Sequence, residues 1–432
     1  MTEPEVARFG TASGSANGRT VLAVHPSPDG YGADLQLVQT VHALVDDGWR
    51  VVVALPHPGP LVDRLTATGA DTAFLDFPVL RKASANPLAL ARLGLAAVAC
   101  LPRAVRLLRR IRPAVLLVNT VTLPWWLLVG RLTRTPTIGY VHEAETAAAG
   151  LVRRALLAPL LLADAVLVIS EAVRAATVAA QPRLAGRIRL VYNGVPSAPH
   201  PIGPPARSRP TRLAVVGRLS PRKAPHVVLE AVRRIAQRHD VVLELAGTAF
   251  AGYEWYENQL RATAAEPDLA DRVQFSGYCS PVWPVLERAD IVVAPSVQEP
   301  FGNVVVEAQL SGRPVVAAAA FGHLESVRDE RTGLLVPPGD ATALAAAVER
   351  LITDPRLAAR LAEQGRAEAQ RRFSVSRYRS EIAALVDGVA RGPVPVRPAG
   401  SSRSGWFAPS PWGGTPAGGD GSDRTTPRVV RD

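Results

Sequence analysis

Cysteine is almost absent from this 432-residue sequence, and the shortage excludes several classes of protein. Only Cys100 and Cys279 occur, far apart and without metal-ligand neighbours. They cannot form the framework of a disulfide-rich secreted domain, and they are typical of a reducing compartment. The first nineteen residues lack the apolar core of a secretory signal. We therefore expect a cytoplasmic protein.

Acidic residues are missing from one long basic segment. Between Phe77 and His142 there is no Asp or Glu. The same segment carries ten of the cations behind a net charge of +11: Arg81, Lys82, Arg92, Arg103, Arg106, Arg109, Arg110, Arg112, Arg131 and Arg134.

Aromatic residues are scarce as well, at 5%. A nucleic-acid binder would interleave aromatics with its cations, but Trp125, Trp126 and Tyr140 lie away from the arginine cluster. Leucines instead alternate with arginines in Leu101–Ile111, which is typical of an amphipathic helix on anionic lipid. An ordinary solvated helix is the alternative. We expect peripheral membrane contact through Arg81–Arg112 and no nucleic-acid partner.

The longest uncharged run of the sequence is a candidate membrane span by its length alone. The longest uncharged stretch, Pro113–Gly130, approaches the roughly 18 residues that a span requires. Polar residues such as Asn119 and Thr122 interrupt it, and Val115–Val118 has the composition of a buried strand. The stretch is therefore interpreted as globular core.

Short apolar strands alternate with longer helical patterns along the chain, as in βαβ units with parallel sheets. This fold class is α/β, with two Rossmann-like doubly wound domains. The strands predicted for the first domain are Val21–Val24, Arg50–Leu55, Thr72–Phe77, Val115–Asn119, Ile138–Val141, Ala165–Ile169 and Arg189–Tyr192. Those predicted for the second are Leu213–Val216, Val241–Ala246, Val273–Ser276, Ile291–Ala294, Val315–Ala318 and Leu334–Val336.

The expected domain organisation follows from composition. A Pro-rich stretch separates the two series of strands, and a Pro-, Gly- and Ser-rich stretch too poor in apolar residues to fold alone follows the last helix. The predicted parts are a flexible N-terminus at 1–19, a first domain at 20–195, a linker at 196–210, a second domain at 211–373, a closing helix at 374–391 and a disordered tail at 392–432.

Two carboxylates, Glu299 and Glu307, follow the predicted strand Ile291–Ala294. If a helix begins near Asn303, Glu299 lies in the preceding loop and Glu307 about one turn into the helix. The amides of Phe301, Gly302 and Asn303 would then be free donors for hydroxyls or anions. The alternative is a loop acid and a solvated helix acid without a ligand.

Two cations, Arg218 and Lys223, follow the strand Leu213–Val216. Arginine binds phosphate oxygens bidentately and lysine adds a compact charge, so the pair suits a pyrophosphate and its departure. A solvated basic loop is the alternative. In the first half, Gly32 lies at a strand-to-helix turn, and His142 ends a strand where a cleft is expected. His142 is equally compatible with a structural role.

Taken in order, these features resemble glycosyltransferase family 4, from about Arg19 to Leu385. The resemblance is most specific in the second half: Val-Gly-Arg-Leu219 with Lys223, the Glu299/Glu307 pair, Ser311-Gly-Arg-Pro-Val-Val316 and Thr332-Gly-Leu-Leu-Val-Pro-Pro-Gly-Asp340. It implies the GT-B architecture and a retaining, metal-independent transfer from a nucleotide-diphosphate sugar. The absence of any Asp-x-Asp pair agrees with an enzyme that needs no metal or other cofactor.

The resemblance also implies roles for individual residues. Arg218 and Lys223 would bind the donor diphosphate, and Glu307 the ribose. The transferred sugar would contact Glu299, the amides of residues 301–303, the Gly32 loop and His142. Three positions depart from the family pattern, since Tyr31, Phe321 and Ala224 stand where glycine is usual.

The acceptor is open at this level. The basic segment favours a lipid-linked acceptor in glycolipid or cell-surface polysaccharide synthesis, and a soluble small-molecule acceptor is the alternative. A sugar-nucleotide 2-epimerase of the same fold would use its nucleotide sugar without a second substrate, and its motifs differ from the ordered set above.

Overall fold

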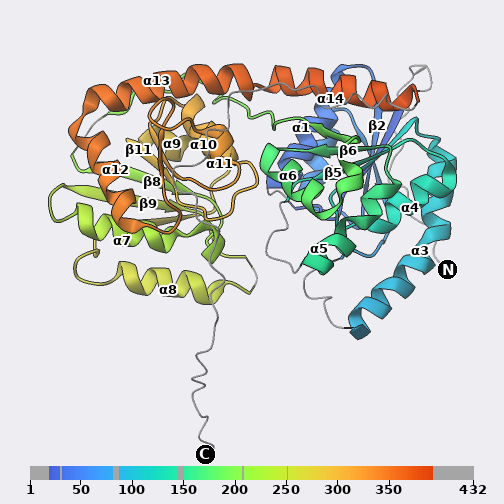
Figure 1. The fold of residues 1–432 in the computed structure, drawn as a ribbon, viewed down its shortest axis with the longest axis horizontal. Coiled ribbons are helices and arrows are strands. Elements are labelled where there is room, and N and C mark those ends of the chain that lie inside the picture. Colours follow the sequence, from blue (N-terminus) through green and yellow to red (C-terminus); the bar gives the residue numbers. More distant parts are fainter. Residues whose placement is uncertain are drawn as a thin grey trace, which may run out of the picture. The chain divides into compact units, whose positions relative to one another are not determined.

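The computed structural model describes residues 19–29, 32–80, 87–143, 150–206, 209–250 and 252–392. The predicted tail beyond Gly392 and most of the predicted N-terminal segment lie outside these residues, as do Arg81, Lys82 and Tyr31. Figure 1 shows two sheets, each covered by helices.

The first sheet has seven parallel strands in the order β3-β2-β1-β4-β5-β6-β7. Its strands are β1 (Thr20–Val24), β2 (Arg50–Leu55), β3 (Asp71–Phe74), β4 (Val115–Asn119), β5 (Thr137–Val141), β6 (Ala165–Val168) and β7 (Ile188–Leu190). The helices between them are α1 (Gly32–Asp46), α2 (Leu61–Thr66), α3 (Pro87–Ile111), α4 (Pro124–Thr133), α5 (Gly150–Leu157), η2 (Ala158–Leu162), α6 (Glu171–Ala180) and η3 (Pro182–Leu184).

The second sheet has six parallel strands in the order β10-β9-β8-β11-β12-β13. Its strands are β8 (Thr211–Val216), β9 (Val241–Ala246), β10 (Val273–Gly277), β11 (Ile291–Ala294), β12 (Val315–Ala318) and β13 (Leu334–Val336). The helices are η4 (Pro221–Lys223), α7 (Pro225–Ile235), α8 (Glu254–Ala264), α9 (Trp283–Arg288), α10 (Asn303–Leu310), α11 (His323–Ser326), α12 (Ala341–Thr353), α13 (Pro355–Arg372) and α14 (Val375–Ala390).

The central strands are buried on both faces, which explains their continuous apolar sequences. Every residue of β1, β4 and β5 is buried, as are those of β11 and β12. Strands covered by helices on both faces cannot alternate apolar and polar residues. The predicted α/β fold with two doubly wound parallel sheets is confirmed.

Two strands, β3 and β7, end two or more residues earlier than their apolar sequences predict. The reason is that the residues after each strand end keep their apolar side chains in the core although their backbone no longer pairs in the sheet. The amide of Leu75 makes the last bond from β3 to β2, at 3.0 Å to the carbonyl of Leu55, and Phe77 is buried outside the sheet. Similarly, β7 ends at Leu190 although Val191 is buried.

The stretch Pro113–Gly130 forms β4 and most of α4, in agreement with its interpretation as core. Trp126, Leu127 and Val129 of α4 are buried, and α4 packs against α3.

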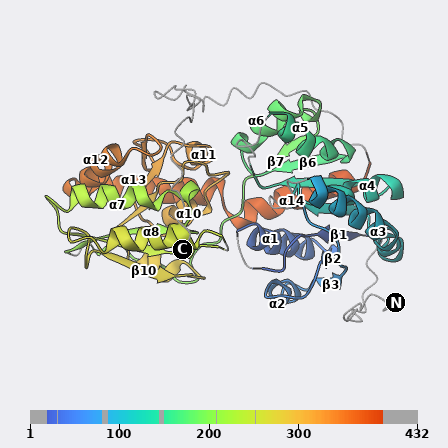
Figure 2. The same ribbon diagram turned by 90° about the horizontal axis from the view of Figure 1, so that it is seen from below.

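The last helix, α14, packs against the first sheet's domain although it follows the second sheet in sequence. It lies beside α1 in Figures 1 and 2. The hydroxyl of Tyr378 lies 2.6 Å from that of Thr40 and 3.3 Å from that of Tyr140. A Cβ on Gly194 would lie 2.6 Å from the Cβ of Tyr378. Glycine at 194 therefore lets α14 approach.

We expect Gly194→Ala to lower the free energy of unfolding by roughly 1–3 kcal/mol, because the added methyl group overpacks against the rigid base of Tyr378. The matched control is Gly388→Ala in α14, where a Cβ meets nothing within 4 Å. There the same change should be neutral or stabilise by up to about 1 kcal/mol, since alanine favours helices. Chemical denaturation measures both. Equal effects of the two substitutions would contradict the packing argument.

Candidate functional site

A cavity of about 350 Å³ lies at the carboxyl ends of strands from both sheets. Doubly wound folds place ligands at this edge, where side chains and amides are free of sheet pairing. It brings together seven of the predicted residues: His142, Arg218, Lys223, Glu299, Phe301, Gly302 and Asn303. Glu307 does not line it, whereas Ala33, which follows Gly32 in α1, does.

The loop after β8 carries the two predicted cations into this cavity. Gly217, at φ +140°, begins the loop, and Gly247 at the end of β9 approaches it so closely that a Cβ would lie 1.9 Å from the carbonyl oxygen of Gly217. Arg218 is exposed, with its guanidinium 5.6 Å from the ring centre of Phe250. Lys223 ends the short helix η4.

Lys223 and Glu299 form an ion pair within the cavity. Burial is the largest single influence on Glu299 and opposes its ionisation, but Lys223, His323 and Arg222 together outweigh it and lower the pKa of this carboxyl. The two side chains are 22% and 12% exposed, so the pair is largely shielded from water. A ligand phosphate would have to share Lys223 with Glu299.

Helix α10 begins at Asn303, as the sequence predicts. Within the described residues, the amides of Phe301, Gly302 and Asn303 donate no hydrogen bond, so this helix start presents three free donors. Gly302 has φ +94°, and a Cβ there would lie 2.8 Å from Cδ2 of His323. Only glycine fits this turn.

Glu307 lies on α10, is half-buried and is not among the residues that line the cavity. Burial raises its pKa to about 7, although the positive charge of Lys223 opposes the shift. Near neutral pH this carboxyl is therefore only partly ionised in the free protein. Ionisation is favoured by any ligand that donates hydrogen bonds to it.

On the first domain's side, His142 follows β5 and lines the cavity. Its Nε2 lies 2.7 Å from Oδ1 of Asn119 at the end of β4. Nδ2 of Asn119 lies 2.7 Å from Nδ1 of His25, and Nε2 of His25 lies 2.7 Å from Oδ1 of Asp34. Burial lowers the pKa of His142 to about 3, the neighbouring His25 acts in the same direction, and Asp34 opposes the shift. His142 is therefore a neutral imidazole.

Two of the three departures from the family pattern keep the backbone conformation that favours glycine. Ala224 and Phe321 have φ of +52° and +47°. Left-handed backbone is costly for residues with a Cβ, which explains the usual glycine at both positions. The third departure, Tyr31, lies outside the described residues.

Several cavity residues were not predicted from the sequence. His323 lies beside Gly302, and its Nδ1 donates to the carbonyl of Ala318 at 3.0 Å. Tyr278, which follows β10, also lines the cavity and is half-exposed. Both residues follow the carboxyl end of a strand, and this position in the sequence could have indicated that they lie at the cavity. Asn119, the last residue of β4, carried the same signal, although its sequence context indicates only an interruption of an apolar run.

No group of three or more His, Cys, Asp or Glu residues in the described ranges could hold a metal ion. The segment 144–149, which contains Glu145, is outside those ranges. Metal independence of the reaction remains a prediction.

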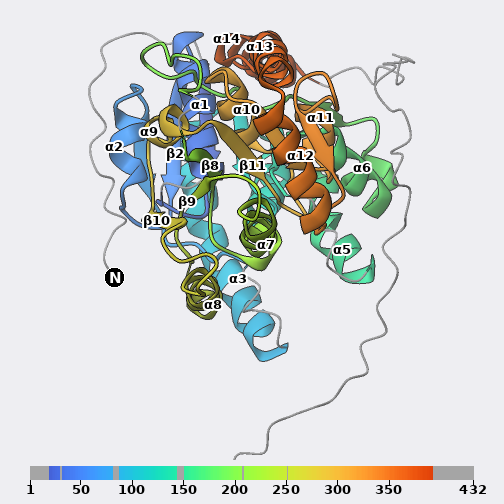
Figure 3. The ribbon, with the colours of Figure 1, turned by 90° about the vertical axis from the view of Figure 1, so that its left-hand side faces the viewer.

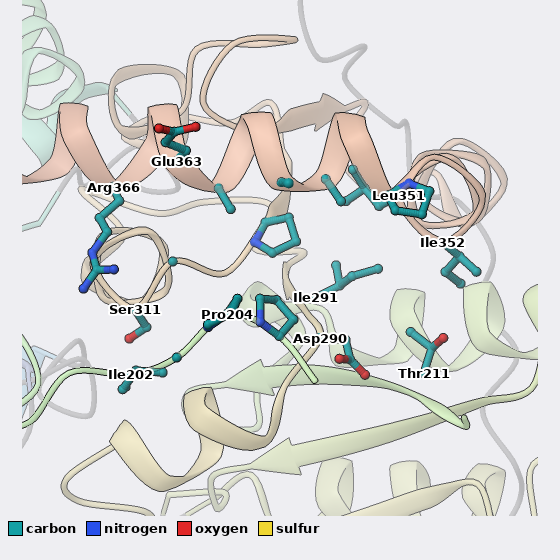
Figure 4. A pocket seen from close by; sticks show the side chains of 18 of the residues that line it. Ile202, Pro204, Thr211, Asp290, Ile291, Ser311, Leu351, Ile352, Glu363 and Arg366 are labelled. Carbon is teal, nitrogen blue, oxygen red and sulfur yellow. The ribbon is translucent and has the colours of Figure 1, made fainter. Parts of the chain in front are cut away.

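A second cavity, of about 650 Å³, lies elsewhere in the second domain (Figure 4). Ile202, Ile291 and Leu351 line it together with the charged residues Glu363 and Arg366. It lies at the amino ends of β8 and β11, and none of the predicted site residues lines it. It is therefore separate from the candidate site.

Comparison with known proteins identifies both halves of the chain. The family described as Glycosyltransferase Family 4 matches residues 31–198, and the family described as Glycosyl transferases group 1 matches residues 203–368. Together these two regions cover more than half of the sequence.

Curated relatives match over part of their length. The lipopolysaccharide core biosynthesis glycosyltransferase LpsE of Rhizobium meliloti is 36% identical over 159 residues, which cover 37% of this chain and 44% of the relative. A D-inositol 3-phosphate glycosyltransferase of Salinispora tropica is 39% identical over 173 residues, covering 38% and 36%. The chain thus matches less than half the length of these relatives.

Solved structures match over most of the chain. Anabaena Alr3699/HepE in complex with UDP-glucose superimposes with a TM-score of 0.71 at 25% identity, covering 85% of this chain and 99% of that one. The complex of the same protein with UDP gives a TM-score of 0.72. Two parallel-sheet domains, the cavity at their strand ends and these matches lead to one conclusion: the chain is a GT-B glycosyltransferase of family 4.

Proposed function

We propose that this glycosyltransferase transfers a sugar from a nucleotide-diphosphate donor to an acceptor hydroxyl, with retention of the anomeric configuration and without a metal. The observation that carries the proposal is the cavity itself, which combines Arg218, Lys223 and three free amides with the carboxylate of Glu299. The UDP and UDP-glucose complexes of HepE support a nucleotide-sugar donor.

The donor diphosphate binds Arg218 and Lys223 in this proposal. Both cations stabilise the negative charge that develops on the leaving phosphate, which is typically the largest electrostatic contribution to such a reaction. Lys223 is paired with Glu299 before the donor binds. Donor binding redirects part of the lysine's charge to phosphate and frees Glu299 to accept hydroxyls of the transferred sugar.

The remaining contacts follow the geometry of α10. The amides of residues 301–303 donate to the sugar, while Glu307 accepts from the ribose hydroxyls. The Gly32 loop and His142 approach the sugar from the other domain.

Retention follows from a same-face attack. The acceptor oxygen bonds to the anomeric carbon as the bond from that carbon to the phosphate oxygen breaks, and the acceptor's proton moves to the leaving phosphate. His142, with a pKa of about 3, is too weak a base to take this proton near neutral pH. In this proposal the leaving phosphate accepts the proton instead of His142.

The acceptor is lipid-linked in this proposal, and α3 carries the argument. Within the described residues, its stretch Leu88–Ile111 is the one helical segment long and apolar enough to cross a membrane, and 17% of its most apolar window is buried. Leu95 and Val98 are 72% and 65% exposed. In Figures 1 and 3 the first half of α3 projects beyond its sheet.

The second half of α3 is anchored in the domain. Ala104 and Leu108 are buried in the core, while the arginines 103, 106, 109 and 110 are exposed. An exposed apolar half followed by a basic half suits a helix that inserts shallowly and contacts anionic headgroups. We therefore propose a cytoplasmic enzyme docked peripherally on the membrane, acting in glycolipid or cell-surface polysaccharide synthesis.

Glu307→Gln should weaken nucleotide-sugar binding. It should also abolish two pH dependences of the wild type that run in opposite directions, one of stability and one of donor affinity. The wild-type folded state holds a proton at Glu307 between the ordinary carboxyl pKa of 4.5 and about 7. Stability of the free enzyme therefore falls as pH rises through this window, whereas donor affinity rises because the ribose needs the ionised carboxylate.

The glutamine variant should melt higher than wild type at pH 8 and lose both dependences. Thermal denaturation and calorimetric titration with UDP-glucose, UDP or GDP from pH 5.5 to 8.5 measure them. A wild-type affinity that does not change with pH would contradict the role of Glu307.

Arg218→Ala should reduce donor affinity or turnover by about 1.5–3 kcal/mol, the usual magnitude for a hydrogen bond to a charged group. The control is Arg238→Ala, since Arg238 is exposed and pairs with Glu349 away from the cavity. Both variants should remain folded. Unchanged kinetics of Arg218→Ala would remove this residue from the site.

Activity should persist in excess EDTA, because Arg218 and Lys223 supply the positive charge that a metal would otherwise place on the diphosphate. Turnover of donor by the full-length enzyme is measured with and without chelator. Complete loss on chelation, restored by Mn²⁺, would overturn the metal-independent mechanism.

Binding to vesicles should increase with their anionic lipid content and weaken as salt rises. The triple variant Arg106→Glu, Arg109→Glu, Arg110→Glu should lose the salt-sensitive part of vesicle binding. The double variant Leu95→Gln, Val98→Gln should lose the part of the binding that remains at high salt. Leu324→Gln is the control, since Leu324 is 41% exposed in the other domain. Co-sedimentation measures all four proteins. If all partition alike, α3 is a solvated helix and a soluble acceptor is favoured.

A further inference from the structure

Four buried polar side chains form a continuous series of hydrogen bonds behind the cavity. They come from the ends of three adjacent strands and from the first turn of α1: His25 after β1, Asn119 in β4, His142 after β5 and Asp34 in α1. Each of the three links measures 2.7 Å. Of the four, only His142 lines the cavity.

The amide of Asn119 determines the direction of every link. Its Nδ2 can only donate, so Nδ1 of His25 accepts and carries no proton. His25 then bears its proton on Nε2 and donates it to the carboxylate of Asp34. The Oδ1 of Asn119 can only accept, so Nε2 of His142 donates. All donors thus point along the series toward Asp34.

This order leaves one nitrogen of His142 for a ligand. Nε2 is committed to Asn119, and within the described residues the ring makes no other hydrogen bond. Tyr140 packs on the ring at a centroid distance of 4.0 Å and fixes its plane. The nitrogen that remains is Nδ1, a lone-pair acceptor.

We propose that Asp34, His25 and Asn119 are positioning residues that hold His142 in its Nε2-protonated tautomer, so that Nδ1 accepts a hydrogen bond from a hydroxyl of the donor sugar. The inference rests on the proposed function, because it takes the cavity as the donor site. It adds a selection rule, since a bare nitrogen accepts from a hydroxyl but has no proton to offer to a phosphate oxygen. The ring therefore selects sugars with a free hydroxyl at this position.

Burial makes the arrangement costly unless every group is paired. His25 and Asn119 are 1% and 0% exposed, and Asp34 is 7% exposed. Buried polar groups without partners destabilise a protein by about 1–3 kcal/mol each, and apolar side chains would fill the same space without that requirement. The negative charge of Asp34 lies in the first turn of α1, where the helix dipole stabilises it. An acceptor held at one end thus orients every proton up to the cavity.

The direct test is the tautomer of His142 in the full-length protein labelled with ¹⁵N-histidine. His142→Phe assigns the resonances. Asn119→Leu removes both central links, while Asp34→Asn keeps an acceptor for His25 and serves as the conservative variant. His226, whose Nδ1 lies 2.6 Å from the hydroxyl of Tyr256 in the other domain, is the internal control.

In wild type, Nδ1 of His142 should be unprotonated and Nε2 protonated at every pH from 6 to 8. Asn119→Leu should convert His142 into a mixture of tautomers, whereas Asp34→Asn, which keeps an acceptor for His25, should retain the wild-type signal. The resonances of His226 should be the same in all proteins. A protonated Nδ1 in wild type, or a tautomer that ignores Asn119→Leu, would overturn the proposal.

A second measurement connects the tautomer to the sugar, using UDP, UDP-glucose and the monodeoxy analogues of UDP-glucose as probes. One deoxy position should reduce wild-type affinity by about 3- to 10-fold, the usual range for one hydrogen bond. The same deoxygenation should have no effect in His142→Phe, and UDP should bind both proteins alike. If every deoxy analogue loses equal affinity in both proteins, Nδ1 does not contact the sugar and the proposal fails.

These outcomes separate the two proposals. If wild type binds neither UDP nor UDP-glucose, this donor class is wrong for the proposed function, while the tautomer measurement in the free protein still decides the hydrogen-bond order. If the probes bind but the tautomer is reversed, the transferase proposal stands and the positioning role is excluded.

Discussion

Burial of both sheets on two faces is the constraint from which the site follows. In strands such as β1, β4 and β11, a polar side chain occurs only at a strand end or not at all, because an unpaired polar group further in would destabilise the fold. Polar side chains that could bind a ligand are therefore found where the strands end. Asn119, His142 and Ser296 all lie at or just beyond carboxyl ends and are nonetheless buried. The two parallel sheets thus concentrate polar groups on the edges that line the cavity.

Part of the charge in the free cavity is paired internally. Lys223 pairs with Glu299, and Glu307, which does not line the cavity, has a pKa of about 7. A dianionic ligand that binds Lys223 therefore rearranges this pair. This rearrangement favours a ligand that supplies both phosphate for the cations and hydroxyls for the carboxylates, as a nucleotide-diphosphate sugar does. A bare diphosphate would leave Glu299 without a partner.

Sequence patterns predicted most of this architecture because burial dictates composition. The bounds of β2, β4, β9 and β11 agree with their apolar runs, and the start of α10 follows from the Pro-Phe-Gly turn. What could not be predicted depends on pairing across long sequence distances. The hydrogen bonds of Asn119 reach residues 94 and 23 positions away. Likewise, the exposure of Leu95 on α3 depends on which helices pack nearby, which the sequence of α3 does not state.

Asn119 also shows how one residue connects fold and chemistry. As the last residue of β4 it pairs with Tyr140 in the register of β5, so its side chain is held between His25 and His142 by the sheet itself. A shift of one residue in this register would turn the amide to the other face and break both hydrogen bonds at once. The same parallel pairing that builds the core therefore determines which nitrogen of His142 carries its proton. In this chain, the register of a strand pair sets the hydrogen-bonding character of the cavity.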